Sequence, residues 1–285
     1  MSNLDLSSGK SATLQRTAQV VEHVRMARDT YRIRLEQPDL ARVIRPGQFV
    51  MLRLPGRLDP LLGRPFALYD TFLDAQGEPA GIDVVYLVVG KMTGILKDVA
   101  VSQSLVVWGP LGHPFPDPAG DQDVALVAGG IGQTPFLAHI RELLGTRGYG
   151  GQPVRRRTRR VRLYYGVRDA ELAAGVKDFE SAGAEVHLAS NDGSIGHRGF
   201  VTELLESHPA PQHLFGCGPE PMLHALAKVA ERMRVPCHVS LETPMACGVG
   251  ICFSCVTRVK TDDGWDYRRV CVDGPIFESR KLCWE

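Results

Sequence analysis

Between Thr17 and Pro116 the apolar residues fall in short runs that turn residues separate. The runs are AQVVEHVRM, YRIRLEQ, GQFVMLRLP, FALYD, IDVVYLVVG and QSLVVWG. Several short strands at close spacing are typical of a small antiparallel barrel. The sequence therefore predicts an antiparallel β-barrel over residues 17–117, which follows an N-terminal tail over residues 1–16.

A stretch rich in proline, glycine and aspartate, from Pro114 to Asp121, predicts a linker. Beyond it, strand-like runs alternate with helix-like ones. The pairs are DVALVAGG with TPFLAHIRELLG, VRLYYGV with ELAAGVKDFESAG, AEVHLAS with FVTELLES, and HLFGCG with EPMLHALAKVAERM. Such alternation indicates a parallel sheet covered by helices, so an α/β domain is expected over residues 118–235.

The last segment, residues 236–285, holds four closely spaced cysteines and too little apolar sequence to fold well alone. A bound metal would stabilise so small a unit. The whole chain is therefore expected to be an α+β multidomain protein with a small metal-binding domain at its C-terminal end.

Charge and hydropathy narrow the class of protein. Among 285 residues the formal net charge is only +1, which argues against a global attraction to nucleic acid or to an anionic membrane. The arginine run at 155–160 precedes a strand and contains no aromatic residue, so a solvated loop is favoured over a nucleic-acid site. The N-terminus, MSNLDLSSGKSATLQRT, has no apolar core that resembles a signal peptide. No stretch of the chain approaches the roughly 20 apolar residues of a membrane span, and we expect a cytoplasmic protein.

The cysteine spacing is the most specific signal in the chain. Cys247, Cys252 and Cys255 form C-x4-C-x2-C, and Cys271 follows sixteen residues later. This is the spacing of plant-type [2Fe-2S] sites. Thiolates are suitable ligands for iron-sulfur clusters and for zinc, but structural zinc sites more often carry a second C-x2-C pair. We interpret the four cysteines as ligands of a [2Fe-2S] cluster, with a zinc site as the alternative.

Two glycine-containing turns follow strands of the predicted α/β domain. The sequence GGIGQTP opens a helix, where backbone N–H groups can approach a pyrophosphate, and GCGP ends the fourth strand, where a flat nicotinamide ring could lie against backbone. A glycine turn alone is weak evidence, because strand-to-helix turns often contain glycine. The candidate nucleotide-binding residues are Gly129, Gly130, Gly132, Gln133, Thr134, Cys217, Gly218 and Pro219.

The predicted barrel contains a candidate phosphate and ring site. Arg64 stands two residues before Phe66, a pairing that suits a phosphate beside a stacked ring, although an ordinary strand end would read the same. The turn Gly90 to Gly94, with Met92 and Thr93, could present N–H groups and a hydroxyl to the same phosphates.

These motifs, taken in order, resemble the ferredoxin reductase superfamily. They are R-P-F-A-L, G-G-I-G-Q-T-P, Y-Y-G-V-R, N-D-G-S-I-G-H-R-G-F-V-T, G-C-G-P-E-P-M, S-L-E-T-P-M-A-C-G-V-G-I-C-F-S-C and V-C-V-D-G-P-I-F. The C-terminal motifs, more narrowly, resemble the electron-transfer subunits of NAD-dependent (class 1B) dihydroorotate dehydrogenases. The resemblance covers about residues 17–279.

The resemblance implies FAD in the barrel, NAD in the α/β domain and a cluster that faces an FMN-containing catalytic subunit. That subunit would oxidise dihydroorotate in pyrimidine biosynthesis, within a heterotetramer of two copies of each chain. The implied flavin-binding residues are Arg64, Pro65, Phe66, Ala67, Leu68, Val85, Tyr86, Leu87, Met92 and Thr93. The chain departs from the family pattern at Ala67, where serine is usual, and at Met92, where glycine is usual.

Other functions remain open from the sequence. One is the reductase subunit of another NAD(P)H-linked complex, such as an oxygenase, a hydrogenase-type complex or a bifurcating transhydrogenase; the last two often carry aspartate at the position of Cys247. Another is a redox-silent, zinc-binding assembly module. The choice between NAD and NADP also stays open, because Arg168 could serve either nucleotide, and no residue of this chain is assigned a catalytic role.

Overall fold

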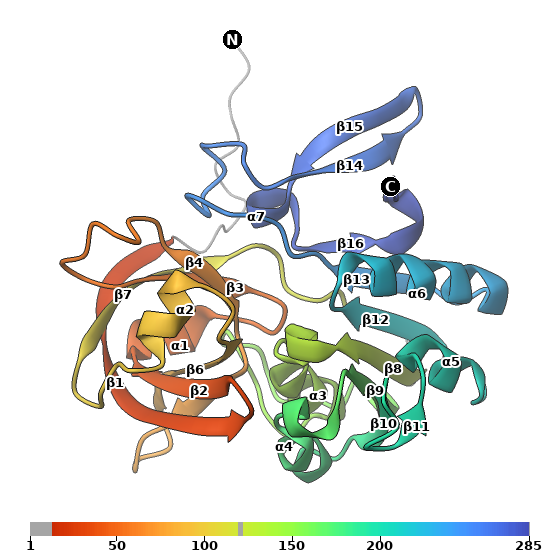
Figure 1. The fold of residues 1–285 in the computed structure, drawn as a ribbon, viewed down its shortest axis with the longest axis horizontal. Coiled ribbons are helices and arrows are strands. Elements are labelled where there is room, and N and C mark those ends of the chain that lie inside the picture. Colours follow the sequence, from red (N-terminus) through yellow and green to blue (C-terminus); the bar gives the residue numbers. More distant parts are fainter. Residues whose placement is uncertain (1–12, 119–121, 285) are drawn as a thin grey trace.

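The computed structural model describes residues 13–118 and 122–284 (Figure 1). Most of the predicted tail, and the end of the predicted linker, lie outside the described residues. Two seven-stranded sheets and one hairpin make up the β-structure of the described chain. The predicted multidomain α+β fold, with an antiparallel sheet followed by a parallel one, is confirmed.

The first sheet is antiparallel, in the order β4-β3-β7-β1-β2-β6-β5. It curls so that β4 approaches β6, and the rings of Phe66 and Tyr86 meet at 6.0 Å. The strands are β1 (Leu14–Ala27), β2 (Thr30–Glu36), β3 (Phe49–Arg53), β4 (Arg64–Ala67), β5 (Asp70–Leu73), β6 (Pro79–Leu87) and β7 (Ser104–Leu111), with helices α1 (Pro38–Val43) and α2 (Lys91–Leu96).

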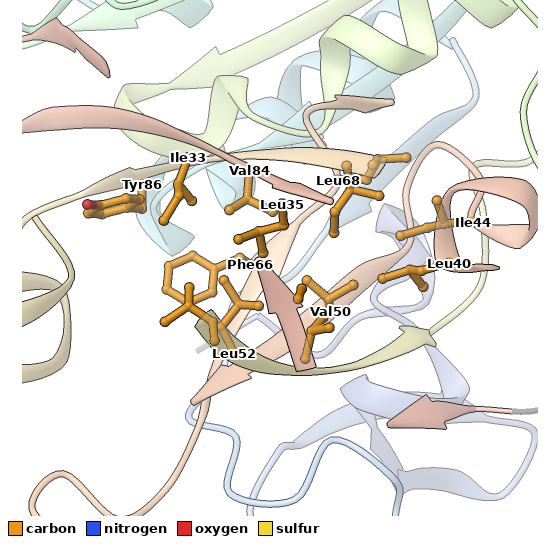
Figure 2. Close-up of a cluster of buried hydrophobic side chains, with 14 of the residues drawn as sticks. Ile33, Leu35, Leu40, Ile44, Val50, Leu52, Phe66, Leu68, Val84 and Tyr86 are labelled. Carbon is orange, nitrogen blue, oxygen red and sulfur yellow. The ribbon is translucent and has the colours of Figure 1, made fainter. Parts of the chain in front are cut away.

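The core of this barrel is built by the inward positions of alternating strands (Figure 2). Ile33 and Leu35, two residues apart on β2, are fully buried, as are Val50 and Leu52 on β3. Side chains at i and i+2 point to the same face of a strand. The short alternating runs of the sequence therefore form one continuous apolar interior.

The second sheet has the order β11-β10-β9-β8-β12-β13-β16, and all neighbours are parallel except β13 and β16. Its strands are β8 (Gln122–Gly129), β9 (Thr158–Val167), β10 (Glu185–Ser190), β11 (His197–Arg198), β12 (His213–Cys217), β13 (Cys237–Ser240) and β16 (Ile276–Glu278). Its helices are η1 (Gly130–Gln133), α3 (Phe136–Leu144), η2 (Ala170–Leu172), α4 (Val176–Ser181), α5 (Val201–Glu206) and α6 (Glu220–Met233).

Helices cover both faces of this sheet. Val124, Leu126 and Ala128 of β8 pack in the same cluster as residues of α3 and α4. Ala125 and Val127, which alternate with them, pack in the cluster that contains residues of α5 and α6. A parallel strand buried on both faces reads as a continuous apolar run, which is how this segment appears in the sequence.

The cysteine-containing segment forms a small hairpin of its own and also contributes two strands to the second sheet. Its hairpin, β14 (Val256–Thr261) and β15 (Gly264–Arg269), is followed by α7 (Val270–Asp273), and after β16 the chain forms η3 (Ser279–Lys281). Strands β13 and β16, from the beginning and end of the segment, extend the second sheet. The cysteine-containing segment is thereby tied to the second, parallel-sheet domain at both of its ends (Figure 1).

A buried carboxylate joins the two sheets' domains. Asp70 of β5 is 5% exposed and accepts hydrogen bonds from the Tyr149 hydroxyl at 2.6 Å and from Arg147 Nη1 at 3.1 Å. Arg141 of α3 also donates to it. Nearby, the Tyr69 hydroxyl donates to Asp178 at 2.6 Å. These bonds fix the barrel against α3 and α4.

We predict that Asp70→Ala destabilises the protein strongly. The change leaves the buried Tyr149 hydroxyl without its acceptor and removes the carboxylate partner of Arg141 and Arg147, which costs about 3 to 5 kcal/mol in comparable buried pairs. Urea unfolding measures the loss. Arg232→Ala, which removes a surface ion pair with Glu206, is the control and should cost less than about 1 kcal/mol. Equal losses in the two variants would contradict the role given to Asp70.

Candidate functional site: two adjoining cavities and a four-cysteine loop

The first cavity has a volume of about 470 Å³ and lies between the barrel and the loop that follows β13. Most of the predicted flavin-binding residues line it: Arg64, Pro65, Phe66, Ala67, Val85, Tyr86, Leu87, Met92 and Thr93. Leu68 does not; it is fully buried in the barrel core (Figure 2). Leu68 follows the last residue of β4 and packs in the core beside Phe66, which reaches both the core and the cavity.

The turn after β6 is held by its own threonine. Thr93 Oγ1 accepts hydrogen bonds from the N–H groups of Val89 and Gly90, at 3.0 and 3.1 Å, and donates to the Gly90 carbonyl. The Thr93 hydroxyl thus fixes the start of α2. Met92 is 3% exposed and packs in the barrel core. Most of its side chain therefore lies inside the barrel and does not fill the turn.

Sequence reasoning missed the opposite wall of this cavity. It is formed by the segment Ser240 to Met245 that follows β13, and by Phe49 and Pro275. Glu242 faces the cavity without an ion pair in the described chain, and the surrounding protein, by displacing water, raises the pKa of its carboxyl. Thr243 Oγ1 is buried with no hydrogen-bond partner in the described chain. The motif S-L-E-T-P-M-A-C covers Ser240 to Met245, but it was interpreted as part of the cysteine site, and only the crossover through the second domain brings these residues to the barrel.

The second cavity, of about 570 Å³, lies at the carboxyl ends of β8, β9 and β12. Gly129, Gly130 and Pro219 of the predicted nucleotide-binding set line it, together with Arg168, Asn191 and Phe200. A methyl group placed on Gly130 would meet no atom within 4 Å, so its backbone faces open space. Thr134 and Cys217, which were assigned to the nucleotide, line the first cavity.

The other predicted residues support these walls from behind. A Cβ atom on Gly132 would lie 2.3 Å from the Cys217 carbonyl oxygen, so the GGIG and GCGP turns pack directly against each other. Gln133 is fully buried, and neither of its amide atoms has a partner in the described chain. Burial raises the pKa of the Cys217 thiol, and the Glu242 carboxylate raises it further.

Leu87 and Ile131 line both cavities. Leu87 ends β6 of the barrel, and Ile131 belongs to η1 of the second domain. The two cavities therefore adjoin at the interface between the domains. Two flat molecules, one bound in each cavity, would therefore lie next to each other inside the protein.

The cysteine loop packs on the outer side of β3 and β7. Cys255 and Cys271 are 2% and 0% exposed, in an apolar cluster with Phe49, Met51 and Met245. Trp108 Nε1 donates to the Cys247 carbonyl at 3.0 Å. Because Phe49 and Met245 also line the first cavity, these two side chains form a shared wall between that cavity and the buried cysteines.

Among the four thiols, Cys252 interacts with Cys247, and Cys271 interacts with Cys255 and, more weakly, with Cys247. Within residues 13–118 and 122–284, no three His, Cys, Asp or Glu side chains are arranged around a single metal ion. The loop between Cys247 and Cys252 turns through Gly248 and Gly250, whose φ angles are +73° and +82°, a conformation that favours glycine. The Val249 N–H points to Cys247 Sγ at 3.4 Å.

An antiparallel barrel beside a parallel nucleotide sheet, with adjoining cavities and a four-cysteine loop, defines a ferredoxin reductase-like electron-transfer protein. A solved NADH-dependent reduced ferredoxin–NADP oxidoreductase chain superposes with a TM-score of 0.79 at 26% identity, over 97% of this chain and 91% of that one. Phthalate dioxygenase reductase shares the fold, with a TM-score of 0.58 at 19% identity, over 91% of this chain and 96% of its own.

The C-terminal residues 242–283 match the model of the iron-sulfur cluster binding domain of dihydroorotate dehydrogenase B. The electron transfer subunit of dihydroorotate dehydrogenase B (NAD(+)) from Desulforamulus reducens is 34% identical, over 94% of this chain and 98% of its own. That from Geobacillus thermodenitrificans is 37% identical, over 92% and 96%. The chain belongs to this family of electron transfer subunits, as the sequence motifs predicted.

The close packing of the two glycine turns yields a prediction. Gly132→Ala should force the turns apart, because its new methyl group would overlap the Cys217 backbone, and overpacking typically costs about 1 to 3 kcal/mol. We expect lower stability in urea and weaker binding of NAD by fluorescence titration. Gly94→Ala in α2, where a methyl group meets nothing within 4 Å, is the matched control. Unchanged NAD affinity in Gly132→Ala would show that the turns do not shape the nucleotide cavity.

Proposed function

We propose that this chain carries electrons between NAD and an FMN-containing catalytic subunit that oxidises dihydroorotate, in pyrimidine biosynthesis. The chain is an oxidoreductase subunit whose cofactors are FAD, a [2Fe-2S] cluster and NAD. The single observation that carries the proposal is the shared wall of Phe49 and Met245, which separates the first cavity from the buried cysteine pair. Flavin is the group that exchanges electron pairs with nicotinamide and single electrons with a cluster.

The residues of the first cavity suit FAD. Phe66, Tyr86 and Phe49 offer apolar walls to a flat ring system, and Arg64 offers a guanidinium for phosphate. Arg64 Nη1 donates to the carbonyls of Leu62 and Gly63, which leaves the other guanidinium N–H groups for a ligand. The orphaned hydroxyl of Thr243 is a further polar group that a bound flavin can satisfy.

The second cavity suits the nicotinamide nucleotide. The exposed backbone of Gly130 can approach a pyrophosphate, and Pro219 ends the turn where the nicotinamide would lie. From there the ring can reach past Ile131 toward the first cavity, which Ile131 and Leu87 share. Cys217 and Glu242 line the first cavity, as Ile131 does, and would shape the space on the flavin side of this junction.

The four cysteines suit a binuclear cluster better than a single zinc ion. In a [2Fe-2S] cluster with four cysteine ligands each iron takes two thiolates, and the thiols here interact chiefly as Cys247 with Cys252 and Cys271 with Cys255. A structural zinc ion would need all four around one point. Cys247, Cys252, Cys255 and Cys271 are therefore proposed as the cluster ligands, and the glycine-rich loop can point N–H groups at the cluster sulfurs.

The partner would dock on the exposed side of the cysteine loop. Ile251 and Phe253 flank Cys252 and are 80% and 62% exposed, which is unusual for large apolar side chains clustered on one loop. Docking there would cover the cluster and bring the partner's FMN close to it.

We further propose a heterotetramer of two copies of each subunit. The structure contains no membrane-crossing helix in its described part, and we propose a cytoplasmic location.

Flavin binding is tested with Arg64→Ala. Removal of a charge-assisted phosphate contact worth about 1.5 to 3 kcal/mol should lower FAD affinity roughly ten- to hundredfold. Flavin fluorescence after dialysis measures retention. Arg53→Ala, which lies on the neighbouring strand and outside the cavity lining, is the control. Full FAD retention in Arg64→Ala would refute the phosphate assignment.

The electron route is tested with Cys252→Ser, which puts a harder ligand on iron and should weaken or abolish the cluster. Iron and sulfide should fall from about two of each per chain. The rhombic electron paramagnetic resonance signal that a [2Fe-2S] cluster gives after reduction with dithionite should disappear. NADH oxidation by an artificial acceptor should survive, whereas NAD reduction by dihydroorotate in the reconstituted complex should collapse. Stoichiometric zinc in the native protein, or full coupled activity in the cluster-free complex, would overturn the proposal.

A further inference from the structure

A third cavity, of about 550 Å³, lies away from the two proposed cofactor cavities. One wall is the C-terminal half of α6 with the start of β13, and the other is formed by β14, the end of β16 and η3. It therefore lies where the nucleotide domain meets the cysteine-containing segment (Figure 1). Its volume is close to that of the nucleotide cavity and is in the usual range for small-molecule sites.

Basic side chains reach this cavity from both walls. Lys228 and Arg234 come from α6 and its C-cap, and Lys260 and Arg280 come from the cysteine-containing segment. The side chains of Lys228 and Arg234 have no hydrogen bond or ion pair within the described residues, and that of Lys260 donates to the Arg280 carbonyl, at 3.1 Å. Arg280 pairs with Glu278, so three of the four cations have no carboxylate partner within the described residues.

Two carboxylates also line the cavity, and only one of them is free. Glu278 is already engaged by Arg280 and by Lys281, the latter at 3.1 Å. Glu231 is the other. The cations outnumber the acids, and like charges on facing walls repel each other unless an anion lies between them. A bound anion would thus hold α6 and the cysteine-containing segment together.

The cavity also has an aromatic end. The rings of His224 and Trp284 are parallel within 4°, with centroids 5.5 Å apart, and Trp284 Nε1 donates to the Ser279 carbonyl at 3.1 Å. Both rings line the cavity. A planar ring can stack beside this pair while a phosphate reaches the cations.

We propose that this cavity binds a phosphorylated small molecule with a planar ring, of the size of a mononucleotide. Its walls lead to both electron-transfer elements. Lys260 lies on β14, which starts directly after Cys255, and the first turns of α6 carry Pro221, Met222 and Ala225 of the nucleotide cavity. A ligand here therefore bridges the helix that shapes the nucleotide cavity and the strand that follows a cluster ligand.

Calorimetric titration of the full chain, loaded with its cofactors, with uridine 5′-monophosphate (UMP) tests the proposal. Saturating NAD is present throughout, so that the probe cannot occupy the nucleotide cavity. We expect a dissociation constant below about 1 mM at low salt. The double variant Arg234→Gln, Lys260→Gln should weaken binding about tenfold or more, because it removes two charge-assisted contacts. Arg232→Gln, on the same helix but outside the cavity and paired with Glu206, should bind like the wild type.

Inorganic phosphate and Trp284→Leu separate the two halves of the ligand. UMP should bind more tightly than phosphate, and Trp284→Leu should reduce this difference while leaving phosphate affinity unchanged. Equal affinities for UMP and phosphate in the wild type would overturn the ring contact. Absence of saturable UMP binding below about 10 mM, or unchanged binding in the double variant, would overturn the site. These readouts do not depend on dihydroorotate oxidation, so they stand or fall separately from the proposed function.

Discussion

The arrangement of the sites depends on one apolar wall, formed by Phe49 and Met245. Phe49 starts β3 of the barrel, whereas Met245 comes from the loop after β13, almost two hundred residues later. Both are nearly inaccessible to water and contact the first cavity on one side and the buried cysteines on the other. A polar or hydrated wall would let solvent reach the first cavity and the buried cysteines. Dense packing of Phe49 and Met245 therefore keeps water out as well as stabilising the fold.

Such a wall is useful only if the domains on either side keep their positions. The fold meets this requirement with buried polar contacts between the barrel and the second domain, in which Asp70 accepts from two arginines and a tyrosine. The Asp70 carboxylate and the Tyr149 hydroxyl are buried and depend on each other and on the half-buried arginines, which makes the geometry specific. Apolar contacts alone would tolerate small sliding movements, and Leu87 would then lose its alignment with Ile131 where the two cavities meet.

The local part of this design was predictable from the sequence, and the part made by distant contacts was not. The spacing of Cys247, Cys252, Cys255 and Cys271, and the GGIG and GCGP turns, report backbone requirements that operate within a few residues. By contrast, nothing near Glu242 or Phe49 in the sequence indicates that they share a cavity, because the chain folds the whole second domain between them. Leu68 was assigned to the flavin by its motif, but it is fully buried in the barrel core and does not line the cavity.

The burial of the cysteines gives the loop a direction. Cys255 and Cys271 lie against the shared wall, whereas Cys252 is exposed between Ile251 and Phe253. A binuclear centre held by these two pairs would have one iron toward the flavin cavity and the other toward the surface. Electrons entering through the wall would leave beside apolar side chains that water covers poorly and a partner covers well. The buried ligands Cys255 and Cys271 thus fix the site against the barrel, while the residues around Cys252 remain accessible to a partner.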